Sequence, residues 1–256
     1  ISLDNNTGTT GATFSGTAKT ITGTINGAAA GEGTVIVSGT PTFVSTIGNT
    51  YRPAQLTING ATTFQAAVQT TLLTTTAAIS SGTSLDASGA SSIGDNITTT
   101  GAQTYTGATT LTADSSLTAG SSTISFGNTV NGAQSLTFTG SGTVTFTGAV
   151  GGTTPLTTIT NAAGQQLTFS DAVTATTIAN YGTLLFNATS AKTISPAITD
   201  LGTKTIQVIN SADTTISTIT FSGTVVTDTL TIGSSTKSGA ALFSGASGVT
   251  VNTVTT

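Results

Sequence analysis

Three copies of one short pattern decide the fold: Tyr105-Thr106-Gly107-Ala108-Thr109, Phe126-Gly127-Asn128-Thr129-Val130 and Phe146-Thr147-Gly148-Ala149-Val150. Their aromatic residues stand 21 and then 20 residues apart. A fixed period of this length is typical of a solenoid, in which each repeat is one turn that buries its apolar side only against the neighbouring turns. The stretch therefore predicts stacked turns of roughly 20 to 22 residues.

The same pattern extends towards both ends of the chain. Phe43 and Phe64 stand 21 residues apart, and one more period reaches Leu85, which takes the aromatic place before Tyr105. After Phe146 the spacings are 23, 17, 35 and 22, so one turn near residue 206 lacks its aromatic residue. We expect one internal aromatic column, whose members include Phe14, Phe64, Phe126, Phe146 and Phe169. The Gly-rich stretch 27–33 has no apolar alternation and is expected to bulge from one turn as a loop.

Within each period, apolar residues alternate with Thr or Ser, as in the stretch 143–147. Alternation of period two is typical of strands with one buried face. Gly-containing turns such as Asn131-Gly132 and Asn59-Gly60 separate the strands, and helix signals are absent. The sequence predicts an all-β fold: a parallel β-helix, or β-solenoid, of about 12 turns that forms a single domain over residues 1–256.

The composition excludes several classes of function. The chain has no Cys, His, Met or Trp, and its 5 basic and 9 acidic residues give a formal net charge of -4. Five scattered cations cannot neutralise a nucleic-acid backbone or an anionic membrane, so neither is an expected partner. No stretch approaches the roughly 20 apolar residues of a membrane span. Absence of Cys suits an oxidising, extracellular setting, and the first residue is Ile rather than Met. We therefore expect a processed piece of a longer secreted polypeptide.

Catalytic, cofactor-binding and metal-binding residues are not predicted. Without His or Cys, the common base of a nucleophilic triad and the soft metal ligands are missing. A β-helical carbohydrate-active enzyme would need paired carboxylates on neighbouring turns. Asp95 and Asp114 are nearly one period apart, but they precede their respective aromatics by different distances and are therefore out of register; Asp213 and Asp228 fit the period less well. Such an enzyme is kept as the alternative function.

Thr-x-Thr pairs raise a second alternative, an ice- or surface-binding solenoid. The pairs are Thr137 with Thr139, Thr145 with Thr147, and Thr229 with Thr231. A flat Thr array needs one pair per turn at a constant offset, whereas these pairs shift relative to Phe. Generic Thr on the outer face of a strand is the simpler interpretation. Three Asn-x-Thr glycosylation patterns begin at Asn5, Asn96 and Asn187, and in so Thr-rich a chain they are near the number expected by chance.

One stretch resembles a known family. The run Asn131–Phe138 followed by Gly142–Leu156 is similar to repeats of filamentous-haemagglutinin-like and autotransporter-like bacterial adhesins, and Gly101-Ala102-Gln103 echoes Gly132-Ala133-Gln134. The similarity covers residues 97–160. It implies a right-handed parallel β-helix at the bacterial cell surface, used for adhesion, biofilm or fibre building, with no catalytic residue to transfer. The expected function is an extracellular structural or adhesive solenoid, with host or surface glycans as further candidate partners.

The two ends of the chain bear on its partners. Residues 248–256 alternate to the last residue, and residues 1–6 contain one acid and no amphipathic cap. Free-standing parallel β-helices cover their terminal strands with a helix, a loop, Pro or charge. We therefore expect further repeats or copies of the same chain to stack end to end on this one.

Overall fold

The structure is a computed structural model that describes residues 1–3, 11–201, 204–210, 218–234, 236, 238–245 and 248–255. It is all-β with no helix in the described residues, and its parallel strands are stacked in about 11 turns. The predicted β-solenoid is confirmed, with one turn fewer than the expected 12. The chain comprises two compact units, Ile1–Gly127 and Asn128–Thr256, described separately below. One domain over residues 1–256 stays a prediction.

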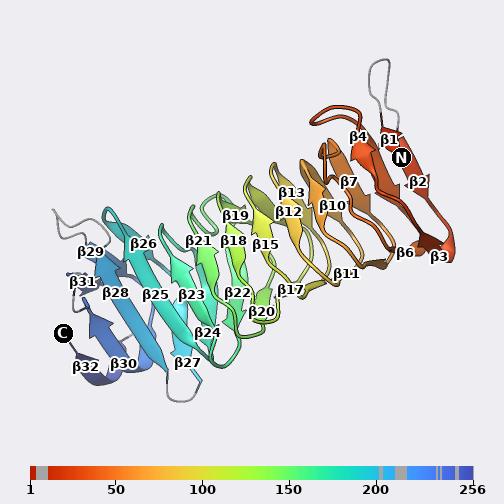
Figure 1. Ribbon diagram of the computed structural model, residues 1–256. Helices are drawn as coiled ribbons and strands as arrows, with labels where there is room; N and C mark the ends of the chain where they lie inside the picture. The colour runs from red at the N-terminus through yellow and green to blue at the C-terminus, as the bar shows by residue number, and fades with distance from the viewer. Residues whose placement is uncertain are drawn as a thin grey trace. The chain divides into compact units, whose positions relative to one another are not determined.

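In the first unit, strands of successive turns lie side by side and pair in parallel on three faces (Figure 1). Face A contains β2 (Gly11–Phe14), β5 (Thr34–Val37), β7 (Gln55–Ile58), β10 (Leu72–Thr75), β13 (Ser91–Ile93) and β16 (Thr109–Leu111). Face B contains β3 (Thr17–Ile21), β6 (Thr40–Phe43), β8 (Thr62–Phe64), β11 (Ile79–Ser81), β14 (Ile97–Thr99) and β17 (Ser115–Thr118). Face C contains β9 (Val68–Thr70), β12 (Leu85–Ala87), β15 (Gln103–Tyr105) and β18 (Ile124–Phe126), and the short strands β1 (Ser2–Leu3) and β4 (Asn26–Gly27) pair with each other.

The second unit repeats this organisation on longer strands. One ladder joins β20 (Leu136–Thr139), β22 (Leu156–Asn161), β24 (Ala175–Asn180), β27 (Ala197–Asp200), β30 (Val225–Ile232) and β32 (Val249–Thr255). A second ladder joins β21 (Val144–Phe146), β23 (Gln166–Phe169), β25 (Thr183–Ala188) and β28 (Thr205–Asn210) to the far end of β30. A third joins β26 (Lys192–Ile194), β29 (Thr218–Phe221) and β31 (Ala240–Phe243), and β19 (Val130–Asn131) adds a short strand.

The alternating sequence places apolar side chains inside. In β5, Val35 and Val37 are fully buried while Thr34 and Ile36 are half-buried on the outer side. Register keeps the same kind of residue in the same column, since Val35 pairs with Leu56 on the next turn. Burial of each apolar side chain in a column therefore stabilises the fold by about 25 cal/mol for every Å² of apolar surface removed from water.

The aromatic residues do not all lie in one column. In the second unit, Phe146, Phe169 and Phe186 stack with ring centroids 4.9 and 5.4 Å apart, and the Phe221 ring meets that of Phe186 edge-on at 5.2 Å. Phe43 stacks on Phe64, Tyr105 on Phe126, and Phe221 on Phe243. The turn that was expected to lack an aromatic residue does so, because Val208 pairs with Phe186.

The prediction that Leu85 continues the aromatic column is wrong. Phe64 on face B pairs with Ser81, less than one full period further along the chain, whereas Leu85 lies on face C between Val68 and Gln103. Tyr105 occupies the column of Ala87, so it lies on a different face from Phe64. Two turns of the segment are shorter than the period, and the aromatic residue moves to another face of the turn. The stretch between Phe64 and Tyr105 resembles two full periods only by coincidence.

Glycine at the corners allows turns to stack closely. A Cβ atom added at Gly107 would lie 2.3 Å from the carbonyl carbon of Gly89 on the preceding turn. Gly148, two residues after Phe146, is equally restricted, since a Cβ atom there would lie 2.6 Å from the carbonyl carbon of Asn128. The stretch 27–33 forms the expected loop, in which the Ala29 amide donates to the Glu32 carboxylate over 3.0 Å.

Candidate functional site

A buried polar network crosses the interior of the first unit. The Tyr105 hydroxyl donates to Gln103 Oε1 over 2.9 Å, and Gln103 Nε2 lies 2.8 Å from the Thr118 carbonyl oxygen and 3.1 Å from that of Ile97. Burial raises the pKa of the Tyr105 phenol far above its usual value. The phenol is therefore a neutral hydrogen-bond donor that fixes Gln103. Gln134, which echoes Gln103 in the sequence, is only half-buried and precedes its strand.

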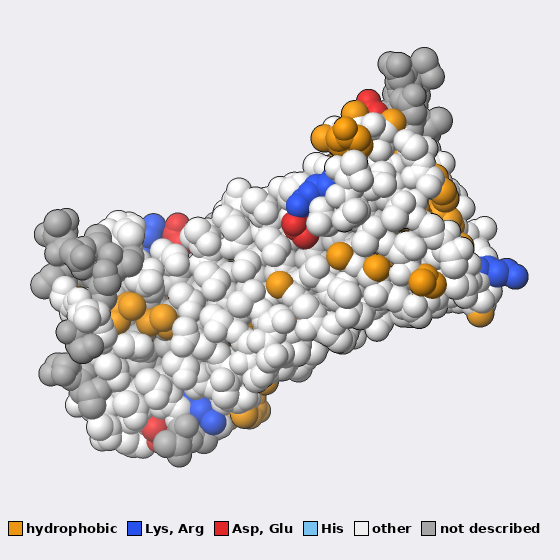
Figure 2. All heavy atoms as spheres, in the orientation of Figure 1, with side chains coloured by type: hydrophobic (Ala, Val, Ile, Leu, Met, Phe, Trp, Pro, Cys, Tyr) orange, Lys and Arg blue, Asp and Glu red, His pale blue; other side chains and the backbone are white. Residues whose placement is uncertain are grey.

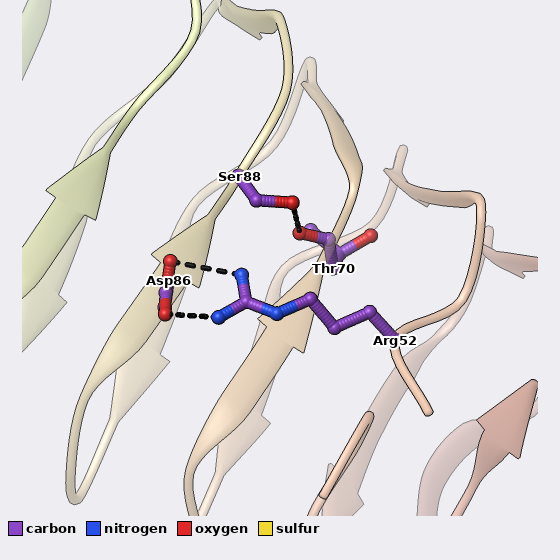
Figure 3. A network of polar contacts seen from close by, with 4 residues as sticks. All are labelled: Arg52, Thr70, Asp86 and Ser88. Carbon is purple, nitrogen blue, oxygen red and sulfur yellow. Dashed lines mark hydrogen bonds and ion pairs between the residues drawn. The ribbon is translucent and has the colours of Figure 1, made fainter. Parts of the chain in front are cut away.

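An ion pair connects distant turns on the surface of the same unit. Both guanidinium amino groups of Arg52 donate to the Asp86 carboxylate, over 3.0 and 2.5 Å (Figure 3). Asp86 pairs in register with Gln69 on the preceding turn, and the Gln69 amide donates to the Ile47 carbonyl on the turn before that. Arg52 follows Ile47 in the chain. The Arg52 side chain therefore passes the turn of Gln69 to reach Asp86. Close by, the Ser88 hydroxyl lies 3.5 Å from the Thr70 carbonyl oxygen.

We expect Arg52→Ala to lower the free energy of unfolding by about 1 kcal/mol, because the pair is bidentate but about a third exposed to solvent. Arg52→Lys keeps the charge and loses the two-pronged geometry, so it should recover only part of that loss. Urea unfolding of both variants, and of each combined with Asp86→Asn, measures the coupling. A coupling energy of zero would contradict the interpretation of the pair as a tie between turns.

In the second unit, polar residues replace the apolar ones in one inner column. Asn161 pairs with Asn180, which pairs with Asp200. Asn180 Nδ2 donates to Asp200 Oδ1 over 2.6 Å, and Asn180 Oδ1 accepts from the Gly182 amide over 3.1 Å. The Thr227 hydroxyl donates to the second oxygen of Asp200. This column, defined by Asn161, Asn180, Asp200 and Thr227, is called the Asn column below.

The charge of a second acid, Asp228, acts on Asp200 at the end of the Asn column. Burial, together with the charge of Asp228, raises the pKa of Asp200 despite the hydrogen bonds that it accepts from Thr227, Asn180 and the Asp228 amide. Asp228 itself accepts from the Lys204 amide over 3.2 Å and from Asn252 Nδ2 over 2.7 Å. A pair of acids in unequal environments is the arrangement from which acid–base sites are built. Here protein groups bind both oxygens of each acid.

The pKa of Asp171 is shifted in the opposite direction from that of Asp200. Burial alone would raise the pKa of Asp171, but the ammonium group of Lys192, 2.7 Å away, and the Ala172 amide outweigh burial and hold the pKa below its usual value. Lys192 lies in β26, on the turn after Asp171. The ion pair thus joins two successive turns.

These two acids predict opposite effects of pH on stability. The raised pKa of Asp200 gives a contribution that is present below the unfolded value of 3.8 and is lost as the pH rises through the folded value. The lowered pKa of Asp171 gives a contribution that is present above 3.8 and is lost as the pH falls. Asp200→Asn should therefore gain stability relative to the unsubstituted chain as the pH rises, whereas Asp171→Asn should lose it. Thermal melts across the acid range measure both differences. Parallel curves for the two variants would contradict the assignment.

The acids considered from the sequence do not assemble into one site. Asp95 Oδ1 accepts from the amide of its own neighbour, Asn96. Asp95 and Asp114 also follow the register partners Ile93 and Leu111 at unequal distances along the chain, so they do not stack in one column. Asp213 lies outside the described residues. The interaction of Asp200 with Asp228 was not predicted.

The quoted Thr-x-Thr pairs lie on outer faces without forming a continuous double row. Thr145 pairs with Thr168 on the next turn, but Thr231 pairs with Gln207. Of the glycosylation patterns, Asn96 is exposed and its Oδ1 accepts from the Ser116 amide, Asn187 is half-buried, and Asn5 lies outside the described residues.

Figure 2 shows few charged side chains on the visible face, separated by uncharged polar side chains and backbone. The described residues contain no group of three or more acids that could hold a metal ion. They also contain no helix of the length and apolarity needed to cross a membrane.

Together, the parallel ladders, buried columns and inter-turn ties define a β-solenoid protein. Comparison of the chain with protein-family models, with curated proteins and with solved structures finds no match.

Proposed function

We propose that the chain is an extracellular structural or adhesive β-solenoid, a filament subunit or an adhesin stalk segment at a bacterial cell surface, without catalytic activity. One observation carries the proposal: four acids each bind a group from another turn. Asp86 binds Arg52, Asp171 binds Lys192, Asp200 binds Asn180, and Asp228 binds Asn252. Because the chain has few charged residues, the use of these carboxylates to link turns favours a structural role.

The competing proposal is a β-helical carbohydrate-active enzyme that uses Asp200 and Asp228. The raised pKa of Asp200 beside a second carboxylate favours it. A general acid must, however, reach a glycosidic oxygen. Both Asp200 oxygens already accept from Asn180 and Thr227, so we favour a structural role for this acid.

Turnover assays separate the two proposals. The full chain is incubated with neutral and acidic polysaccharides, and new reducing ends and unsaturated products are measured. A structural solenoid should release neither. Release by the unsubstituted chain that disappears in Asp200→Asn, with melting preserved, would establish the enzyme. Asp171→Asn is the matched control, since this acid also forms a tie but has no second carboxylate among its interactions.

End-to-end stacking is part of the proposal. Val249 and Val254 in β32 continue the buried columns of Val225 and Leu230, yet they are 43% and 57% exposed. A further turn, from the same polypeptide or from a second copy, would cover these side chains and pair with the strand. Sedimentation and electron microscopy of the isolated chain test self-association. A monomer at every concentration would contradict end-to-end stacking of copies. Antibody labelling of intact against permeabilised cells tests the extracellular location.

A further inference from the structure

Face A of the first unit carries an open groove along four successive turns. The groove has a volume of about 260 Å³ and is lined by side chains of β7, β10, β13 and β16. Its two walls are rows of outward-facing residues held in register by the β-ladder. One row is apolar and contains Leu72, Ala90 and Ala108; the other carries hydroxyls and contains Thr74, Ser92 and Thr110.

The hydroxyl row is available to a ligand. Thr74 pairs with Ser92, and Ser92 pairs with Thr110, so one hydroxyl recurs on each turn at the strand spacing of about 4.8 Å. Among the described residues, no protein partner is found for these three hydroxyls. At one end, Gln55 Nε2 donates to Thr57 over 3.0 Å, which leaves its carbonyl oxygen and one N–H unused.

The apolar row is unusual for so polar a surface. Leu72 is 40% exposed, and Ala90 and Ala108 are exposed beside it on the following turns. No charged residue lines the groove. A ligand that fits must therefore be neutral, present C–H groups along one side and hydroxyls along the other, and repeat along its length.

We propose that the face A groove binds an extended, neutral, β-linked glycan chain. Pyranose rings offer an apolar C–H surface for the Leu72 row and hydroxyl groups for the Ser92 row. A β-linked chain is straight enough to follow a row across several turns, whereas an α-1,4-linked chain coils away. Because the groove is open and shallow, binding should be weak for one site and should strengthen when many copies act together. This inference rests on the proposed adhesive function and specifies its ligand class.

Amide NMR shifts of the full chain, titrated with cellohexaose, N-acetylated chitohexaose or β-1,4-mannohexaose, test the proposal. We expect signals of β7, β10, β13 and β16 to move with at least one of these probes and to stay in place with maltohexaose. Ser92→Arg places a long side chain in the groove and should weaken binding about tenfold or more. Ser125→Arg is the matched control, because Ser125 is the outward central residue of β18 on face C, away from the groove, and this variant should bind as the unsubstituted chain does.

Failure of this inference and failure of the proposed function give different results. No movement of the face A signals with any β-linked probe, or equal losses of binding in Ser92→Arg and Ser125→Arg, would overturn the groove and leave the structural role standing. Binding followed by cleavage of the probe, detected by mass spectrometry, would support the groove and overturn the non-catalytic function. Thermal melts establish that each variant is folded.

Discussion

Phe146→Ala should lower the free energy of unfolding by about 3 to 5 kcal/mol, the usual cost of truncating a fully buried aromatic residue. Phe146 is fully buried, its ring lies 4.9 Å from that of Phe169 with 6° between the planes, and the Phe138 ring meets it edge-on at 5.7 Å. The neighbouring turns are fixed by their ladders, so they cannot close the resulting cavity without breaking hydrogen bonds. Urea unfolding, or the shift of the melting temperature, measures the loss.

The adjacent residue supplies the control for this prediction. Thr147 is exposed immediately after β21, so Thr147→Ala should change the free energy of unfolding by less than about 0.5 kcal/mol. Similar losses for the two variants would mean that the inward and outward positions of β21 are wrongly assigned.

Gln103→Leu should be nearly as damaging, with an expected loss of about 2 to 4 kcal/mol from buried polar groups without partners. Gln103 is fully buried and accepts from the Tyr105 hydroxyl, while its Nε2 donates to carbonyl oxygens such as that of Thr118. Leucine fills a comparable volume, so the lost hydrogen bonds and not a cavity should account for the loss.

A double variant isolates the contribution of the phenol. In Gln103→Leu, the Tyr105 hydroxyl has lost its acceptor. Tyr105→Phe removes this hydroxyl. Adding Tyr105→Phe to Gln103→Leu should therefore restore about 1 to 2 kcal/mol, although Tyr105→Phe alone is destabilising. If the two losses simply add, the Tyr105 hydroxyl has another acceptor and the network is misassigned.

Alternation and period are local properties, and they were sufficient to predict the class of fold. In β21, Val144 and Phe146 point inward and Thr145 points outward, as the sequence pattern requires. An alternating segment of this length cannot bury its apolar side alone, and a short regular repeat leaves stacking as the solution. The loop at 27–33 was equally readable, because it lacks alternation.

The register of individual turns was harder to predict from the sequence. Ser81 and Thr99 follow Phe64 in its inner column, so the aromatic residues no longer mark the turns there. A corner can lose residues without disturbing the inward and outward order of the strands. The number of residues in a turn therefore depends on how its corners pack, as at Gly107. The spacing of aromatic residues in the sequence does not reveal this number.

The Asn column went unrecognised for a related reason. A prediction that uses only the hydrophobic pattern assigns polar residues at inner positions to turns. A signal was nevertheless present: Ile-x-Asn or Ile-x-Asp ends three strands, at Asn161, Asn180 and Asp200, each close to one period after the last. Identical amides on adjacent turns can satisfy one another and the corner backbone. The face A groove could not be predicted, because it requires the register of four strands.

The pairing of Phe64 with Ser81 is the point at which the described solenoid departs from a strict sequence period. Nitroxide labels on outward-facing neighbours test it directly, since the chain has no native cysteine. Labels introduced by Thr63→Cys and Ser80→Cys should show strong spin–spin broadening, because these residues pair on adjacent strands of face B. Labels at Thr63→Cys and Ser84→Cys, which turns of one uniform sequence period would make neighbours, should broaden much less. Stronger broadening of the Thr63 and Ser84 pair would contradict the register.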